Sequence, residues 1–374
     1  TGSAEQLVAD LSAVVLDLST RKKSTFELSS HLQALVVDCK VSKAHKAIAK
    51  SLIDAKDAAI FVGVQAQSNP YLSLIQELCE AIANQSGSTL GYLSPSANSA
   101  GACLTGVLPH RGVAGSAVLQ PGQNTSQILS AQHQVLLTLA VNPALELNHT
   151  AIEQQLDDNN DFIIAIDSFS SEFNRDRADL ILPLASFTET SGTFVNVEGL
   201  WQSFKGFTQT DGSIRQGWKI LTALGQLLVP DAFDYADSIS VRNEVKEACR
   251  ELSLENLCGI QSAVTKLPAK PRSIQKVSVT PIYASDSLVR QALPLQKTPL
   301  METQGAVAMN QKQAEKLNLV DGDKVQIKQG QGAAILSLLI DENIATGCVS
   351  VPTGLDAVKD LSSAYGPIEL EKVL

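Results

Sequence analysis

A series of short apolar runs, almost free of polar residues, most constrains the fold of this 374-residue chain. The runs cover residues 58–64, 89–93, 134–141, 162–166 and 180–182. Continuous apolar runs of this length are typical of strands that are buried on both faces of a parallel sheet. The third run ends at Asn142-Pro143 and the fourth at Asp167. The sequence therefore predicts an α/β fold with polar residues at the strand ends.

Segments with helical spacing of apolar residues separate these runs and precede the first of them. The expected helices cover residues 4–18, 26–37, 44–55, 70–83, 151–156, 217–228 and 241–254. Helices that alternate with buried strands cover both faces of an open sheet. Ligands of such sheets bind at the carboxyl ends of the strands, so the polar strand ends are the first candidates for a site.

The chain changes character at residues 267–272, which are rich in proline and basic residues. Beyond them, short strands are expected, separated by glycine turns and joined by one helix at 311–317. The expected strands are 293–295, 324–328, 333–340 and 348–351. This pattern is typical of a small barrel. We predict an α/β region over 1–265 with 1–55 mostly helical, a linker over 266–285, and a barrel over 286–374.

Charge and hydropathy exclude two classes of partner. The chain has 29 basic and 39 acidic residues, a net charge of −10, and no basic block, so a nucleic-acid partner is not expected. No apolar run is long enough to span a bilayer, so direct membrane insertion is not expected either. The acidic balance is explained by an acidic surface alone, and it also allows docking onto basic faces of other proteins.

The cysteines and histidines do not form a metal-binding pattern. The six cysteines are scattered without a C-x-x-C pair, and no two histidines have the spacing of a zinc-binding helix. We therefore expect no metal site, and no local iron–sulfur ligand set, in this chain. The sequence also lacks a G-x-S-x-G elbow and a phosphate-binding loop, which argues against nucleophilic catalysis and nucleotide hydrolysis.

Two polar loops remain as candidates. The loop 94–101 follows a strand, and its backbone N–H groups suit an anion, although a plain connection explains it as well. The loop 189–199 places hydrogen-bonding side chains around two glycines. It fits either a groove for a polar ligand or a rigid polar contact between domains, and spacing does not separate the two.

An ordered set of residues resembles the molybdopterin oxidoreductase family. The first group follows the fifth apolar run and consists of Ala178, Asp179, Leu182, Pro183, Glu189, Gly192, Thr193, Asn196, Glu198, Gly199 and Gln202. An earlier group consists of Asn98, Gly101, Ala102, Gly106, Leu108, Pro109, Asn142 and Pro143. The C-terminal part, with Leu317, Asp321, Gly322, Asp323, Gly347 and Pro352, resembles the family's dinucleotide-binding domain, a double-psi β-barrel.

The resemblance implies a pterin cleft, and departures from the motif imply that the cleft is vestigial. The cleft positions are Asn98, Gly101, Asn142, Asp167, Gly192, Thr193 and Asn196. Ala140 stands where the family has a glycine that lets backbone approach the nucleotide. Leu200 replaces the arginine suited to a phosphate or a pterin carbonyl. We therefore expect no catalytic residue and no cofactor in this chain.

A narrower resemblance is to the G subunits of bacterial respiratory NADH:quinone oxidoreductase, complex I. It includes the stretches 91–111, 187–196 and 201–204. In that family, iron–sulfur domains precede this region, so the chain is expected to be a C-terminal fragment. The resemblance implies a structural and assembly role among other peripheral-arm subunits, on the cytoplasmic side of the membrane. The alternatives are an active pterin-dinucleotide oxidoreductase domain and a Rossmann-type enzyme, which lacks its G-x-G-x-x-G motif here.

Overall fold

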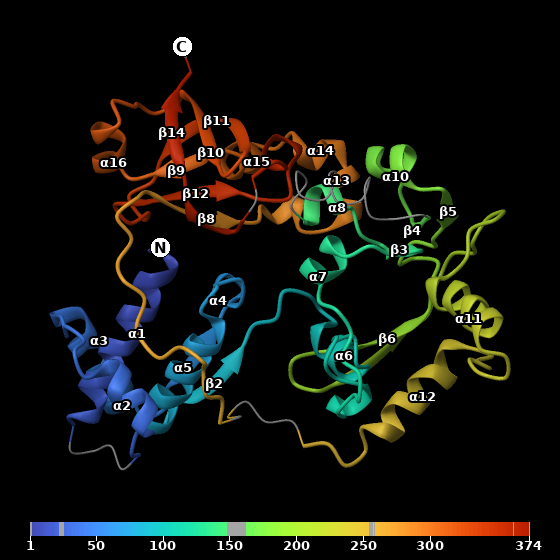
Figure 1. Ribbon diagram of the computed structural model, residues 1–374, viewed down its shortest axis with the longest axis horizontal. Coiled ribbons are helices and arrows are strands. Elements are labelled where there is room, and N and C mark those ends of the chain that lie inside the picture. The colour runs from blue at the N-terminus through green and yellow to red at the C-terminus, as the bar shows by residue number, and fades with distance from the viewer. Residues whose placement is uncertain are drawn as a thin grey trace. The chain divides into compact units, whose positions relative to one another are not determined.

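The computed structural model describes residues 2–21, 26–147, 162–253, 257, 259–361 and 363–373. The chain divides into two compact units, each described by itself below (Figure 1). Unit 1 combines residues 1–93 with residues 255–374, and unit 2 is the continuous stretch 94–254. These units differ from the domains proposed from the sequence, whose bounds stay a prediction. The expected mixed α/β fold is confirmed.

The first stretch of unit 1 packs helices against a small parallel sheet. Its elements are α1 (Ala4–Ser19), α2 (Ser30–Val36), α3 (Lys43–Asp54), β1 (Ala59–Val62), α4 (Val64–Gln67), α5 (Leu72–Ser86) and β2 (Thr89–Tyr92), with β1 parallel to β2. The hydroxyls of Ser3, Ser29 and Ser42 accept hydrogen bonds from the first turns of α1, α2 and α3. These caps explain where the three helices begin. Leu18 of α1 and Leu74 of α5 lie fully buried in the shared core.

Hydrogen bonds connect the two stretches of unit 1. The Glu77 carboxylate of α5 accepts a bond of 2.9 Å from the backbone N–H of Ser262, and both residues are buried. The Tyr365 hydroxyl donates to the backbone oxygen of Gln65 at 2.7 Å. The helical stretch of unit 1 is therefore hydrogen-bonded to the stretch of unit 1 that follows unit 2 in the sequence.

The second stretch of unit 1 forms a curled seven-stranded sheet, which agrees with the barrel-like domain expected there. In spatial order the strands are β13 (Tyr365–Pro367), β8 (Gln275–Val279), β12 (Cys348–Pro352), β9 (Val307–Met309), β11 (Gly332–Ile340), β10 (Lys324–Gln329) and β14 (Glu369–Lys372). Side chains alternate between core and surface along β10, where Val325 and Ile327 are fully buried. This alternation is the period-two pattern from which the strand was predicted.

Short helices connect these strands, and one of them corrects a prediction. They are η2 (Ile282–Ala284), α13 (Ser287–Gln291), α14 (Leu293–Gln296), α15 (Pro299–Gln304), α16 (Gln311–Lys316) and η3 (Asp356–Val358). The predicted strand 293–295 is wrong, because these residues begin α14. Pro294 has no N–H for a strand ladder, whereas the first turn of a helix tolerates proline. The predicted helix 311–317 is confirmed as α16.

Strand β8 lies within the segment predicted as a linker, and it carries a buried lysine. β8 pairs with β12 in parallel and with β13 in antiparallel orientation. The Lys276 side chain is 1% exposed, and its Nζ donates to Oε1 of Gln329 at 3.2 Å. Burial lowers the pKa of Lys276 to about 8. Among the described residues no carboxylate forms an ion pair with it.

Unit 2 contains the predicted parallel sheet. Its elements are α6 (Ser99–Leu104), η1 (Val113–Gly115), α7 (Thr125–Ser130), β3 (Leu136–Leu139), α8 (Pro143–Glu146), β4 (Ile163–Asp167), α10 (Glu172–Arg177), β5 (Leu180–Pro183), β6 (Gly192–Val195), β7 (Trp201–Phe204), α11 (Gly217–Leu228) and α12 (Ser238–Ala248). Strands β3, β4 and β5 are parallel and adjacent in this order. These three apolar runs are confirmed as strands, whereas the other two predicted strands pair separately as β1 and β2 in unit 1. The expected burial on both faces is not found for β3 and β5, in which Leu137, Leu139 and Leu180 are exposed.

Strands β6 and β7 form a separate antiparallel hairpin in unit 2. β6 lies against both α6 and α12, three elements that Figure 1 shows together. The polar segment 189–199 singled out in the sequence forms most of this hairpin's first strand and turn. The hairpin and its two helices enclose the candidate site.

Some predictions fall on residues outside those described. The expected helix at 151–156 is one of them, as are Cys258 and His149. Among the helices of the described residues, none combines the length and the apolar character that crossing a bilayer requires.

Candidate functional site

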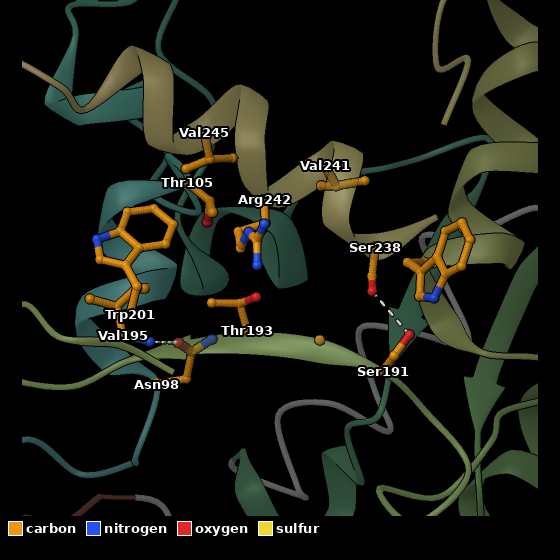
Figure 2. A pocket seen from close by; sticks show the side chains of 13 residues that line it. Asn98, Thr105, Ser191, Thr193, Val195, Trp201, Ser238, Val241, Arg242 and Val245 are labelled. Atoms are coloured by element: carbon orange, nitrogen blue, oxygen red, sulfur yellow. Dashed lines mark hydrogen bonds between the residues drawn. The ribbon is translucent and has the colours of Figure 1, made fainter. Parts of the chain in front are cut away.

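A cavity in unit 2 brings together four of the seven residues proposed for the pterin cleft. Its volume is about 180 Å³, and Figure 2 shows it from close by. The lining consists of Asn98, Gly101, Thr105, Ser191, Gly192, Thr193, Val195, Trp201, Trp218, Ser238, Val241, Arg242 and Val245. The four predicted residues are Asn98 and Gly101 from the start of α6, and Gly192 and Thr193 from β6.

Asn98 connects α6 to β6. Its Oδ1 accepts a hydrogen bond of 2.9 Å from the backbone N–H of Val195 (Figure 2). Gly101 follows one helical turn later, and a Cβ atom there would collide with this same oxygen. The Asn-x-x-Gly spacing therefore has a structural reason, because glycine leaves room for the asparagine to reach the strand.

Gly192 and Thr193 are both engaged by the neighbouring strand β7. Gly192 faces Phe204, and a Cβ atom at this glycine would lie 2.9 Å from the ring. The Phe204 ring also meets Phe194 edge to face at 5.1 Å between centroids. The Thr193 hydroxyl is 2.9 Å from the Ser203 hydroxyl across the hairpin. Both positions thus contribute to hairpin packing.

Asn196 organises the turn that follows β6 and does not line the cavity. Its Oδ1 accepts hydrogen bonds from the backbone N–H groups of Glu198 and Leu200, each at 3.0 Å. Gly199 has a φ of 78°, in the left-handed region that suits glycine. Leu200 is 54% exposed on this turn. The Asn-x-x-Gly-x stretch therefore shapes a tight connection between the two strands.

Asn142 and Asp167 lie at the ends of β3 and β4, and neither lines the cavity. The Asp167 carboxylate accepts bonds from the backbone N–H of Phe169 at 3.1 Å and from Nδ2 of Asn174 at 3.0 Å. Oδ1 of Asn142, by contrast, is buried and has no hydrogen-bond partner among the residues that the structure describes. The sequence motifs predict that the seven positions form one cleft. In the structure, four of them line the cavity, Asn142 and Asp167 lie at the ends of β3 and β4, and Asn196 lies in the turn after β6.

Ala140 has the backbone conformation of a glycine. Its φ of 51° lies in the left-handed region, and its N–H donates to the Ile166 oxygen at 2.8 Å. A non-glycine residue in this region is strained by about 1–2 kcal/mol. The loop therefore retains the shape for which the family uses glycine, although its side chain differs.

Arg242 and both tryptophans line the cavity, although the sequence proposed none of them as a site residue and only Trp201 lies in a family-matching stretch. Arg242 lies on α12 and points toward β6 (Figure 2). Its Nη1 donates to the Ser203 hydroxyl at 3.1 Å. Val241 and Val245 share its face of the helix, a spacing that predicts an amphipathic helix but does not say what the face contacts. On the side of the cavity away from Trp201, the hydroxyls of Ser191, just before β6, and Ser238 of α12 lie 3.0 Å apart (Figure 2).

No group of three or more potential metal ligands is found among the residues for which the structure gives positions. The cavity lining likewise contains no histidine, cysteine or carboxylate. The donors that reach the cavity are hydroxyls, amides and one guanidinium. Chemically, such a set suits recognition of a polar or anionic group.

Comparison with known families yields two matches. The profile of the Molybdopterin oxidoreductase family matches residues 7–227. The profile of the Molydopterin dinucleotide binding domain matches residues 295–366. Together they cover most of the chain, with α12 and β8 outside both.

Curated relatives match over shorter stretches. The mitochondrial NADH-ubiquinone oxidoreductase 78 kDa subunit of Candida albicans is 41% identical over 75 residues, 20% of this chain and 10% of that protein. The G subunit of the NADH-quinone oxidoreductase of Shewanella oneidensis is 49% identical over 53 residues, 13% of this chain and 6% of that protein. The assimilatory nitrate reductase catalytic subunit of Bacillus subtilis is 28% identical over 144 residues, 38% of this chain and 19% of that protein. Each match therefore spans less than a fifth of the relative.

A solved structure shares the fold over nearly the whole chain. Acetylene Hydratase from Pelobacter acetylenicus superposes with a TM-score of 0.64 and covers 98% of this chain and 70% of that one. The two sequences are 12% identical, so the likeness concerns the fold alone.

Proposed function

Since this chain belongs to the molybdopterin oxidoreductase family, we propose that it is a structural and assembly region of a G-subunit protein in the peripheral arm of complex I. In this role it keeps the fold of a pterin-binding oxidoreductase without a working pterin site. Its C-terminal sheet is the counterpart of the family's double-psi barrel. Iron–sulfur clusters and electron transfer are assigned to other parts of the protein and of the complex. The peripheral arm lies on the cytoplasmic side of the membrane.

The observation that carries this proposal is that the family-matching polar residues bind to the protein itself. Asn98 accepts a hydrogen bond from the Val195 N–H, and Asp167 accepts hydrogen bonds from the Phe169 N–H and from Nδ2 of Asn174. Asn196 accepts hydrogen bonds from two backbone N–H groups of its own turn. Side chains whose acceptors are used in this way stabilise the fold and offer less to a ligand.

The size of the cavity does not fit a pterin dinucleotide. Sites for drug-sized ligands have volumes of about 300–1,000 Å³, and a dinucleotide needs the upper part of this range. The cavity in unit 2 has about 180 Å³. Leu200 also offers no donor to a phosphate or to a pterin carbonyl. No catalytic step through a pterin is therefore assigned to these residues.

The end of α11 supports an assembly role. Leu227 and Leu228 are 80% and 81% exposed, and Val229 next to them is half exposed. Adjacent exposed apolar side chains of this size are typical of a protein contact. The partners proposed for this surface are other subunits of the peripheral arm.

The proposal is tested by cofactor analysis of the protein purified within its native assembly. Pterin is measured by fluorescence after oxidation, and molybdenum by mass spectrometry, with a catalytic member of the family from the same cells as the positive control. We expect far less than one equivalent of either. Stoichiometric pterin or molybdenum that co-purifies with the chain would refute the proposal.

A matched pair of variants tests the assembly role separately. Leu228→Asp introduces a charge into the exposed end of α11 and should lower incorporation of the protein into the complex. Leu119→Asp, at a leucine elsewhere in unit 2 that is even more exposed than Leu228, is the control and should not lower incorporation. Equal incorporation of both variants would argue against α11 as a docking surface.

A second candidate function is an active pterin-dinucleotide domain, and the β3 end is the observation that favours it. Oδ1 of Asn142 is buried without a partner among the described residues, and Ala140 keeps a glycine-like backbone. The double variant Ala140→Gly with Leu200→Arg restores the residues that the family has. No gain in binding of a pterin dinucleotide by this variant would argue against this candidate.

A further inference from the structure

The cavity between α6, β6 and α12 contains one cation and no acid. Arg242 is the only ionisable side chain among the 13 residues that line it. The chain as a whole carries a net charge of −10, whereas the lining of this cavity carries a single positive charge. This local positive charge favours an anionic ligand.

Arg242 has donors that remain available. Nη1 donates to the Ser203 hydroxyl at 3.1 Å, while Nε and Nη2 donate to Oδ1 of Asn243 at 3.1 and 2.8 Å. A guanidinium has five N–H donors, so one remains on each terminal nitrogen. No carboxylate forms an ion pair with Arg242 in the part of the chain for which positions are given. The two free N–H groups suit the two oxygens of a carboxylate.

Asp237, at the start of the same helix, does not supply that carboxylate. Its Oδ1 accepts a bond of 2.8 Å from the backbone N–H of Ser240 and caps α12. Asp237 does not line the cavity. Hydrogen bonds from Ser240 chiefly lower the pKa of Asp237, and the nearby charge of Arg242 lowers it further. Asp237 therefore balances part of the Arg242 charge from outside the cavity, while the lining itself contributes no acid.

The rest of the lining is partly apolar. Val195, Val241 and Val245 contribute aliphatic groups, and Trp201 contributes an indole ring beside Arg242 (Figure 2). Thr193 faces the tip of Arg242, and the Ser191–Ser238 pair contributes hydroxyls on the side away from Trp201 (Figure 2). An apolar wall next to a guanidinium selects a ligand that has both an apolar group and an anionic group.

We propose that this cavity binds a small organic monocarboxylate, with its carboxylate on Arg242 and its apolar group against Trp201 and the valines. The volume of about 180 Å³ suits a single ring or a branched aliphatic group. One guanidinium in a partly apolar cavity matches a single negative charge. Arg242 lies outside both family matches, which end at residue 227 and begin at residue 295. This binding does not depend on the assembly role.

The chain provides its own optical probe for the test. Its two tryptophans, Trp201 and Trp218, both line this cavity. Benzoate is the probe ligand, benzamide its neutral isostere and benzylamine its cationic counterpart. We expect a saturable change of tryptophan fluorescence with benzoate. Because charge-assisted bonds to Arg242 are lost, benzamide should bind about tenfold or more weakly, and benzylamine should not saturate the signal.

Variants on α12 complete the test. Arg242→Gln should weaken benzoate binding about tenfold or more. Arg242→Lys should retain part of the affinity, because lysine keeps the positive charge but cannot form a bidentate pair of hydrogen bonds. Lys246→Gln removes one positive charge from an exposed position of the same helix and should leave the affinity within about twofold. Circular dichroism checks that each variant is folded.

Three outcomes would overturn the proposal. They are the absence of saturable benzoate binding up to tens of millimolar, equal affinities for benzoate and benzamide, and unchanged affinity in a folded Arg242→Gln variant. If Arg242→Gln does not fold, the three ligands on the unmodified chain and the Arg242→Lys variant decide the question.

Discussion

The buried lysine of the barrel-like sheet should destabilise the fold near neutral pH. Lys276 on β8 is 1% exposed and has a single side-chain hydrogen bond, to Gln329. Its pKa falls from the usual 10.5 to about 8 because burial disfavours the charged form. Replacement by methionine, which has a similar length and no charge, removes this effect.

The size of the effect follows from the pKa difference. About 2.5 pKa units at 1.36 kcal/mol each give about 3 kcal/mol, the free energy by which burial of the charged lysine destabilises the folded state. The variant also loses the hydrogen bond to Gln329, worth about 1 kcal/mol. Oε1 of Gln329 still accepts from the backbone N–H of Ser363 at 3.3 Å, so it is not left unpaired. At pH 7 we expect Lys276→Met to raise the free energy of unfolding by about 2 kcal/mol.

The pH dependence has a defined sign. Between about pH 8 and 10.5 the unfolded chain keeps the lysine proton while the folded chain releases it. The unfolded state then binds more protons, so the stability of the unmodified protein rises with pH over this window. Below about pH 8 Lys276 is protonated in both the folded and the unfolded state. The difference in the free energy of unfolding between the variant and the unmodified protein is therefore constant there. The advantage of Lys276→Met should therefore shrink as the pH approaches 10.5.

Urea unfolding followed by far-ultraviolet circular dichroism, at several pH values across this window, measures both effects. Lys324→Met is the matched control, because Lys324 is exposed on β10 of the same sheet. It should change the stability little at any pH. A Lys276→Met variant that is less stable than the unmodified chain at pH 7, or one whose stability follows the same pH profile, would refute the reasoning.

Three further predictions concern backbone, packing and thiol chemistry. Ala140→Gly should raise the stability of unit 2 by about 0.5 kcal/mol in urea unfolding, because the relief of left-handed strain exceeds the added entropy of the unfolded chain; a loss of stability would contradict the strain. Gly101→Ala should lower it by about 1–3 kcal/mol, since the new methyl group displaces Asn98 from its bond to Val195; an unchanged urea midpoint would show that the bond is dispensable. Alkylation at pH 8 followed by mass spectrometry should modify exposed Cys103 long before Cys79, whose pKa burial raises to about 11; comparable rates would show that the α5 core opens readily.

The sequence predicted those elements of the fold whose local pattern is unambiguous. The apolar runs at β3, β4 and β5 favour strands of a parallel sheet, although only β4 is largely buried. The strand β8 was missed because Lys276 interrupts its apolar pattern, although the side chain is buried. The prediction of a strand at 293–295 was wrong because two leucines suggest a strand, while the proline between them favours the start of a helix.

Sequence motifs point to part of the cavity lining and miss the rest. The Asn98–Gly101 and Gly192–Thr193 motifs, far apart in the sequence, line one cavity. Arg242 reaches that cavity from another helix, through packing of α12 on β6 that no local pattern encodes. The tertiary fold, and not the spacing of motifs, brings this charge to the site.

The discontinuous construction of unit 1 has a consequence for synthesis of the chain on the ribosome. Unit 2 is continuous, so it can fold as soon as its last residues have emerged. The helices α1 to α5 emerge first but obtain their partner for Glu77 only with Ser262, after the whole of unit 2. During elongation the N-terminal helices therefore stay incomplete while the inserted unit matures, and this interval is when they are most exposed to chaperones.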